Sequence, residues 1–294
     1  MQSFKKLPTM LPKNLYSNKT VLITGGATGL GFAMAKKYAA LNANVLIASR
    51  KLEIVEKSVA DIRESSKNEN VLGFQLDVRN PDRISELIVE LDSRNLFPSV
   101  IVNNAAGNIL SPTEKLSNNA FNSIIDIVLK GTINTTMAFG KHMIHTERQG
   151  VFLNISTTYA KTGSAFVVPS GVAKAGCDNL VKSLAAEWGQ YSIRFVGVAP
   201  GPIFTDGAFS RLDPSGNFQK QLVEKIPMKR MGDKDELANL VTYLTSDYAS
   251  WMTGTIITFD GGETCSNSGE FNELLKLSRN DWRNLLKGKS TRGL

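Results

Sequence analysis

Short apolar runs alternate with stretches of helical periodicity along most of this chain, and that alternation limits the possible fold more than any other feature. Seven runs of three to eight residues are rich in Val, Ile and Leu, at 21–24, 45–48, 71–78, 100–102, 151–155, 195–198 and 255–259. Helical spacing of apolar residues is expected between them, at 30–41, 52–62, 81–91, 118–145 and 170–188. Buried parallel strands joined by helices give this pattern, so we expect an α/β fold: a doubly wound parallel sheet of about seven strands.

The ends of the chain and one internal segment depart from the alternation. Residues 1–18 lack periodicity and are expected to form an N-terminal arm, whereas 19–294 are expected to form a single domain. A Pro- and Gly-containing excursion at 201–234 separates the last two predicted strands. An excursion of this length in a compact domain predicts a substrate lid, with a plain surface insertion as the alternative.

Charge and cysteine content narrow the classes of function. The net charge of +7 suits a ligand with several phosphates, although a solvated basic surface would give the same value. No nucleic-acid-binding motif occurs, and no apolar run reaches the roughly 18 residues that span a bilayer, so neither nucleic acid nor membrane insertion is expected. The two cysteines, Cys177 and Cys265, form no metal-ligand spacing and favour a reducing compartment.

A glycine-rich sequence joins the first predicted strand to the first helix. Gly25, Gly29 and Gly31 let the backbone turn tightly and approach a pyrophosphate, which the free N–H groups of the helix N-terminus would bind. Because the pattern lies in the first strand–helix unit, it predicts a dinucleotide site rather than a plain turn.

The residues after the second strand indicate which dinucleotide is bound. Arg50 and Lys51 stand where an NAD enzyme usually carries a carboxylate, and two cations suit the 2′-phosphate of NADPH. A surface role for Arg50 is the alternative. Asp77, expected at the end of the third strand, is predicted to bond the adenine amino group or to cap the next helix. Asn104 belongs to a small, polar cluster at 103–107, after the fourth strand, that lets a cofactor lie close to the backbone.

Several motifs in order resemble the short-chain dehydrogenase/reductase family. They are TGGATGLG at 24–31, DV at 77–78, NNAAG at 103–107, PG at 200–201 and DGG at 260–262. The resemblance covers about 19–262 and implies a single-domain Rossmann-type sheet, commonly assembled as a homotetramer. It implies that the cofactor contacts Gly25, Gly26, Thr28, Gly29, Leu30, Gly31, Arg50, Lys51, Asp77, Val78, Asn104, Lys174, Pro200, Gly201, Pro202 and Ile203.

One departure from the family pattern concerns the catalytic tyrosine. Most members carry Tyr-x-x-x-Lys, in which the phenol protonates the substrate oxygen. Here Lys174 is present but Ser170 occupies the tyrosine position, and a serine hydroxyl is a far weaker acid. A different tyrosine, Tyr159, follows the fifth strand, whose carboxyl end faces the nicotinamide in related folds.

Longer strings narrow the resemblance to the mitochondrial-type 2,4-dienoyl-CoA reductase branch. They are AAGN at 105–108, SPTE at 111–114, TGSAFVVPS at 162–170, GAFSRLDP at 207–214, SDYASW at 246–251 and SGEFN at 268–272. The branch implies reduction of a dienoyl-CoA by NADPH in β-oxidation, in a mitochondrial compartment. It implies catalytic roles for Tyr159, Asn108, Lys174 and Ser170. It also implies substrate contacts at Arg79, Ile109, Ser117 and Arg211, with no metal.

Two other functions fit the same fold. A carbonyl or alcohol oxidoreductase is disfavoured by the serine at position 170. A catalytically silent NADPH-binding scaffold is disfavoured by the presence of Tyr159, Asn108 and Lys174 together.

Overall fold

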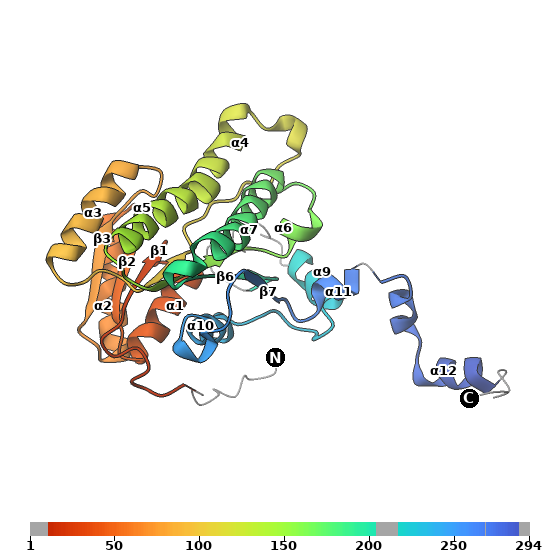
Figure 1. Ribbon diagram of the computed structural model, residues 1–294. Helices are drawn as coiled ribbons and strands as arrows, with labels where there is room; N and C mark the ends of the chain where they lie inside the picture. Colours follow the sequence, from red (N-terminus) through yellow and green to blue (C-terminus); the bar gives the residue numbers. More distant parts are fainter. Residues whose placement is uncertain (1–10, 204–216, 268, 288–294) are drawn as a thin grey trace.

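A computed structural model describes residues 11–203, 217–267 and 269–287 and contains one seven-stranded parallel sheet (Figure 1). The strand order is β3-β2-β1-β4-β5-β6-β7, so the chain reverses its direction of travel between β1 and β4. The strands are β1 (Thr20–Thr24), β2 (Asn44–Ser49), β3 (Val71–Gln75), β4 (Val100–Asn103), β5 (Gly150–Ile155), β6 (Ile193–Pro200) and β7 (Thr255–Phe259). The predicted fold class and number of strands are confirmed.

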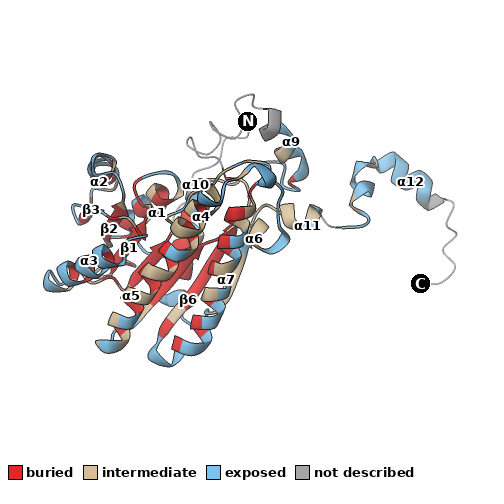
Figure 2. Cartoon of the chain, turned by 90° about the horizontal axis from the view of Figure 1, so that it is seen from above, coloured by how far each residue is buried: buried red, intermediate tan, exposed pale blue. Residues whose placement is uncertain are grey.

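Helices cover both faces of the sheet, which explains why the central strands are apolar on both sides. One core joins α1 (Gly29–Ala40), α2 (Leu52–Ser66) and α10 (Lys234–Leu244) to the sheet. The other joins α3 (Pro81–Ser93), α5 (Gly131–His145) and α7 (Val168–Trp188). Within β1, Val21 and Ile23 enter the first core and Leu22 enters the second. The central strands are accordingly buried (Figure 2).

Three boundaries differ from the sequence prediction. β3 ends at Gln75, so Asp77 and Val78 lie beyond the strand rather than at its end; the Asn80 amide bonds the Asp77 carbonyl (2.9 Å) and turns the chain into α3. The helix predicted at 118–145 is divided into α4 (Asn118–Ile125), a π-helical turn η2 (Asp126–Lys130) and α5. Tyr159, expected in a loop, begins the short helix α6 (Tyr159–Thr162).

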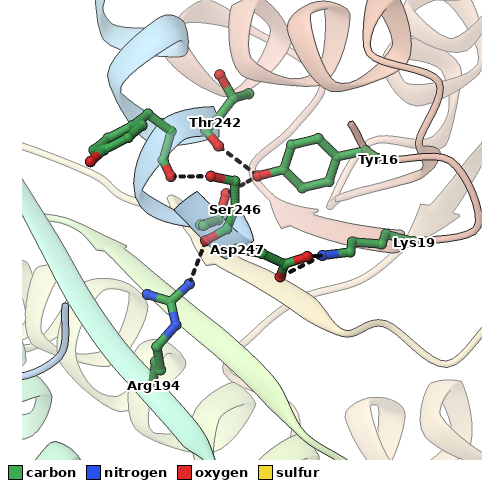
Figure 3. A network of polar contacts seen from close by, with 8 residues as sticks. Tyr16, Lys19, Arg194, Thr242, Ser246 and Asp247 are labelled. Atoms are coloured by element: carbon green, nitrogen blue, oxygen red, sulfur yellow. Dashed lines mark hydrogen bonds and ion pairs between the residues drawn. The ribbon is translucent and has the colours of Figure 1, made fainter. Parts of the chain in front are cut away.

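The described part of the N-terminal arm is anchored by a buried tyrosine (Figure 3). The Tyr16 hydroxyl donates to the Thr242 carbonyl (2.6 Å) and lies 2.7 Å from the Thr245 hydroxyl, at the end of α10. Lys19 forms an ion pair with Asp247 (2.6 Å), and Arg194 bonds the Ser246 carbonyl (3.1 Å). The arm therefore contributes to the core that packs under α10.

The remaining segments lie at the periphery. Short 3-10 turns occur at η1 (Thr113–Lys115), η3 (Gly189–Tyr191) and η4 (Asp247–Ala249). Within the predicted lid the structure describes α9 (Asn217–Lys225) and a bridge between Ile203 and Gly232. After α11 (Glu263–Asn267) the chain leaves the body of the domain through η5 (Asn272–Lys276) and α12 (Arg279–Lys287) (Figures 1 and 2). Among the helices of 11–203, 217–267 and 269–287, none is long and apolar enough to cross a membrane.

Candidate active site

The glycine-rich loop lies where the strand order reverses, beside the carboxyl ends of β1 and β4, the usual ligand position in an open α/β sheet. Asn104 fastens this loop to β4, because its side-chain amide donates to the carbonyls of Thr24 (3.1 Å) and Gly25 (3.0 Å). The Thr24 hydroxyl accepts the backbone N–H groups of Asn104 and Ala105, each at 3.1 Å. The side-chain amide of Asn104 therefore holds the glycine-rich loop against the end of β4.

Gly25 and Gly31 are too closely packed to carry a side chain. A Cβ on Gly31 would stand 2.2 Å from the Gly25 carbonyl oxygen, and one on Gly25 would stand 3.0 Å from the Ala105 Cα. Gly25 also has a φ of +64°, which favours glycine. The first turn of α1 can thus come against the loop, with its N-terminus open to a phosphate.

A cavity of about 250 Å³ opens beside the loop. Residues at or after the ends of four strands line it together with one residue of the π-helical turn η2: Gly25, Thr28, Ala48, Ser49, Arg50, Leu76, Asp77, Val78, Asn104, Ala105, Ala106 and Ile127. Of the predicted cofactor residues, Gly25, Thr28, Arg50, Asp77, Val78 and Asn104 are therefore brought together. Backbone N–H groups, an arginine and a tight glycine loop are the groups that hold the phosphates of a dinucleotide, so these residues fit NADP(H).

Two residues predicted to bind different ligands instead contact each other. The Arg79 guanidinium donates to the Asp77 carboxylate, at 3.0 and 3.1 Å from Nε and 2.5 Å from Nη2. Hydrogen bonding to Arg79 lowers the pKa of Asp77 below its usual range. Asp77 is predicted to contact adenine and Arg79 the acyl-CoA substrate, so either ligand would have to share this pair or displace one partner from it.

The predicted catalytic groups converge at the carboxyl end of β5. The Tyr159 hydroxyl lies 3.3 Å from the Ser170 hydroxyl, and the Asn108 amide nitrogen lies 3.5 Å from the same phenol oxygen. Tyr159 starts α6, Ser170 lies in the first turn of α7, and Asn108 lies in the loop after β4. Three donors from separate segments therefore face one point, with Ser170 buried and Asn108 exposed.

Lys174 lies one turn after Ser170 on α7 and is only 7% exposed. Its ammonium group donates to the Ile155 carbonyl at the end of β5. Burial lowers the pKa of Lys174, whereas the nearby Cys177 and Asp178 act in the opposite direction. The lysine is thus buried one helical turn from Ser170, with its ammonium group bound to the carboxyl end of β5.

The other predicted substrate and cofactor residues are less uniformly placed. Ile109 packs against a small cluster that includes Ile124 and Ala173. The Ser117 hydroxyl caps α4 by accepting the Ala120 amide (3.1 Å), so the structure gives it a local role. Arg211 lies outside the described residues. Pro200 ends β6, and Gly201, Pro202 and Ile203 follow it at the carboxyl end of the sheet, where the Gly201 amide donates to the Phe259 carbonyl (3.0 Å).

Sequence reasoning missed two contributors to the site. Thr24 is needed to fix the glycine loop, and its place at the end of an apolar run was the available signal. Ile127, in the π-helical turn, lines the cofactor cavity. Gly131 ends that turn, and a Cβ there would stand 2.4 Å from Val78, so an isolated glycine in a long helical pattern marked the irregularity.

A larger cavity, of about 610 Å³, lies at the amino ends of the strands, opposite the glycine-rich loop. It is lined by Val100, Val151 and Ile193, at or next to the amino ends of β4, β5 and β6, and by the exposed Trp251. None of the predicted catalytic or cofactor residues lines it. The smaller cavity, which predicted cofactor residues line, is therefore the one associated with the candidate cofactor site.

Comparison with known proteins identifies the family. A family model described as "Enoyl-(Acyl carrier protein) reductase" matches residues 25–264. A short chain dehydrogenase from Bacillus anthracis has 38% sequence identity to the chain and superposes with a TM-score of 0.76, covering 83% of this chain and 96% of its own. The chain belongs to the short-chain dehydrogenase/reductase family. It is therefore an oxidoreductase of that type.

Curated relatives carry more specific names. A Caenorhabditis elegans protein named "Uncharacterized oxidoreductase" is 42% identical over 293 residues, 95% of this chain and 92% of its own. Another from the same organism, named "Probable 2,4-dienoyl-CoA reductase" of the (3E)-enoyl-CoA-producing type, is 41% identical over 88% of this chain and 85% of its own. A Danio rerio protein named peroxisomal 2,4-dienoyl-CoA reductase is 34% identical over 89% of this chain and 87% of its own. The predicted similarity to proteins of the dienoyl-CoA reductase branch is thus confirmed.

Proposed function

We propose that this protein is an NADPH-dependent 2,4-dienoyl-CoA reductase that forms 3-enoyl-CoA in the β-oxidation of unsaturated fatty acids. The observation that carries the proposal is the position of the Tyr159 hydroxyl between the Asn108 amide and the Ser170 hydroxyl. Relatives at about 40% identity that are named 2,4-dienoyl-CoA reductases support the same substrate class.

The cofactor proposed is NADPH, since Arg50 lines the cavity at the carboxyl end of β2 and no carboxylate follows that strand before the helix. A guanidinium can hold a 2′-phosphate through two parallel hydrogen bonds. When bound, NADPH supplies a hydride.

The remaining chemistry is assigned to the residues of this chain. Hydride addition at the far end of the conjugated system moves an electron pair onto the thioester oxygen, forming a dienolate. Tyr159 and Asn108 donate hydrogen bonds to that oxygen, and Ser170 orients the phenol. Lys174 binds the nicotinamide ribose and adds a positive charge below the developing anion. A proton from solvent at the α-carbon completes the two-electron reduction, leaving one double bond in a 3-enoyl-CoA.

The larger assembly and location follow from the resemblance alone. We propose a homotetramer and a mitochondrial compartment, with the peroxisome as the competing location because of the name of the Danio rerio relative. Sedimentation analysis of the purified protein and fractionation of cells that express it test the two proposals.

A substrate panel tests the function itself. Purified protein is mixed with NADPH or NADH and with a 2,4-dienoyl-CoA, a 2-enoyl-CoA or a simple ketone, and cofactor oxidation is followed at its absorbance maximum. We expect turnover of the dienoyl-CoA with NADPH. Activity on ketones alone would point to a carbonyl reductase, and stabilisation by NADPH without turnover of any substrate would point to a silent scaffold.

A further inference from the structure

Exposed apolar side chains lie on two loops that adjoin the segments of the donor cluster. The loop after β4 contains Leu110, which is 54% exposed, and the loop between α6 and α7 contains Phe166, also 54% exposed. Val172, in the first exposed turn of α7, is 51% exposed. Solvent exposure of large apolar side chains is costly unless they have something to contact, so three of them next to one site mark a binding surface.

The two loops are joined directly beside the catalytic groups. The Ser111 amide donates to the Phe166 carbonyl (2.9 Å), so the loop segments that carry Leu110 and Phe166 lie next to each other. Leu110 is two residues from Asn108. On the other side, a Cβ on Gly171 would stand 3.7 Å from the Tyr159 ring, so the turn that carries Val172 abuts that ring. In Figure 1, α6 and α7 lie side by side at this end of the molecule.

Phe166 adopts a backbone conformation that its side chain does not favour. Its φ is +67°, in the left-handed region that a bulky residue rarely enters. Gly163, three residues earlier, has a φ of +75° and could carry such a turn without strain. Strained residues of this kind cluster at ligand-binding segments, where the conformation aims a side chain. Here it accompanies an aromatic side chain that is exposed four residues before Ser170.

The charge pattern of these loops indicates which part of a substrate they meet. No Lys, Arg, Asp or Glu occurs in 105–113 or in 163–173. The phosphates of CoA need cations, and an apolar surface without charge suits a hydrocarbon chain instead. Arg79, which is predicted to contact the acyl-CoA substrate, follows the edge strand β3. The two loops instead follow β4 and β5, which are central strands.

We propose that Phe166 and Leu110 form an apolar clamp on the acyl chain, gripping the methylenes beyond the diene, and that this clamp sets the chain-length preference of the enzyme. The inference rests on the proposed function, since it names the part of the dienoyl-CoA that these two residues contact. The clamp acts in binding and takes no part in hydride or proton transfer.

Two substrates that differ only by four methylenes test the clamp. The wild-type protein should have a kcat/KM about tenfold higher for 2,4-decadienoyl-CoA than for 2,4-hexadienoyl-CoA, because burying part of each methylene favours the longer chain. Phe166→Gly, which accepts the positive φ, should reduce that ratio about fivefold, because the longer chain loses more contact than the shorter one. Leu110→Ala should act in the same direction, and Phe166→Leu should keep most of the preference.

A matched control and a binding measurement make the outcome decisive. Trp251→Ala removes an aromatic that is 99% exposed at the amino ends of the strands, and it should change neither substrate. Equal losses on both substrates in Phe166→Gly, or an unchanged ratio, would overturn the clamp. Titration calorimetry with decanoyl-CoA and hexanoyl-CoA gives the same comparison without turnover. If the wild-type protein binds decanoyl-CoA through Phe166 yet reduces no dienoyl-CoA, the proposed function fails and the clamp stands.

Discussion

Replacing Tyr159 by Phe removes one hydroxyl from the donor cluster and leaves the ring in place. In the free protein that hydroxyl lies 3.3 Å from Ser170 and 3.5 Å from Asn108, both at the long end of hydrogen-bond distances. These contacts contribute little to the fold. Under the proposed mechanism we expect the hydroxyl to make its strongest hydrogen bond to the substrate oxygen, when negative charge develops there.

The expected decrease in kcat depends on the hydrogen-bond donors that remain in the variant. Loss of one preorganised donor to a developing oxyanion lowers kcat by about 100- to 1000-fold, or roughly 3–4 kcal/mol of transition-state stabilisation. Since Asn108 still faces the same point, we expect the lower end of that range, about 100-fold, with KM for the dienoyl-CoA changed by less than about threefold. Ser170→Ala, which removes only the partner of the phenol, should cost about tenfold.

Single-turnover NADPH oxidation at saturating dienoyl-CoA measures the chemical step directly. The unfolding temperature of Tyr159→Phe should match that of the wild-type protein, which separates catalysis from folding. In the double variant with Ser170→Ala the losses should be less than multiplicative, because the serine acts through the phenol. A Tyr159→Phe protein that retains more than a third of the wild-type rate would refute the assignment of this hydroxyl as the donor.

Four further predictions follow from other parts of the structure. Arg50→Ala should raise KM for NADPH about 10- to 100-fold and leave KM for NADH nearly unchanged, as measured by steady-state kinetics with each cofactor. Gly31→Ala should abolish NADPH binding in a titration, because the new Cβ would stand 2.2 Å from the Gly25 carbonyl oxygen. Burial lowers the pKa of Lys174, so a pH–rate profile should show activity falling as the pH rises through that lowered value, below the ordinary titration range of a lysine. Tyr16→Phe should lower the free energy of unfolding in urea by about 1–3 kcal/mol without changing kcat, because the hydroxyl loses its bonds to Thr242 and Thr245.

The parts of the fold that follow from periodicity could be predicted from the sequence. Each of the seven strands overlaps its apolar run, and the glycine loop lies where a strand–helix unit predicts it. In the site, the presence of Ser170 at the usual tyrosine position indicates Tyr159 as the alternative phenol. The structure places the two hydroxyls 3.3 Å apart.

Features that depend on contacts between distant segments could not be predicted. The π-helical turn at Asp126–Lys130 accompanies the close approach of Gly131 to Val78, which belongs to another strand–helix unit. The Arg79–Asp77 pair depends on how the chain turns after β3 ends early. The left-handed conformation of Phe166 is equally invisible in a sequence, since nothing about a phenylalanine favours it.

The identity of the reduced bond tests the central claim most directly. The protein is incubated with 2,4-decadienoyl-CoA and NADPH that carries deuterium at the transferred position, and the product is examined by mass spectrometry and NMR. The account predicts an intact thioester, a single remaining double bond at C3, and deuterium at C5. Deuterium on a carbon derived from the carbonyl group, or a dienoyl-CoA recovered unchanged while a ketone is reduced, would contradict it.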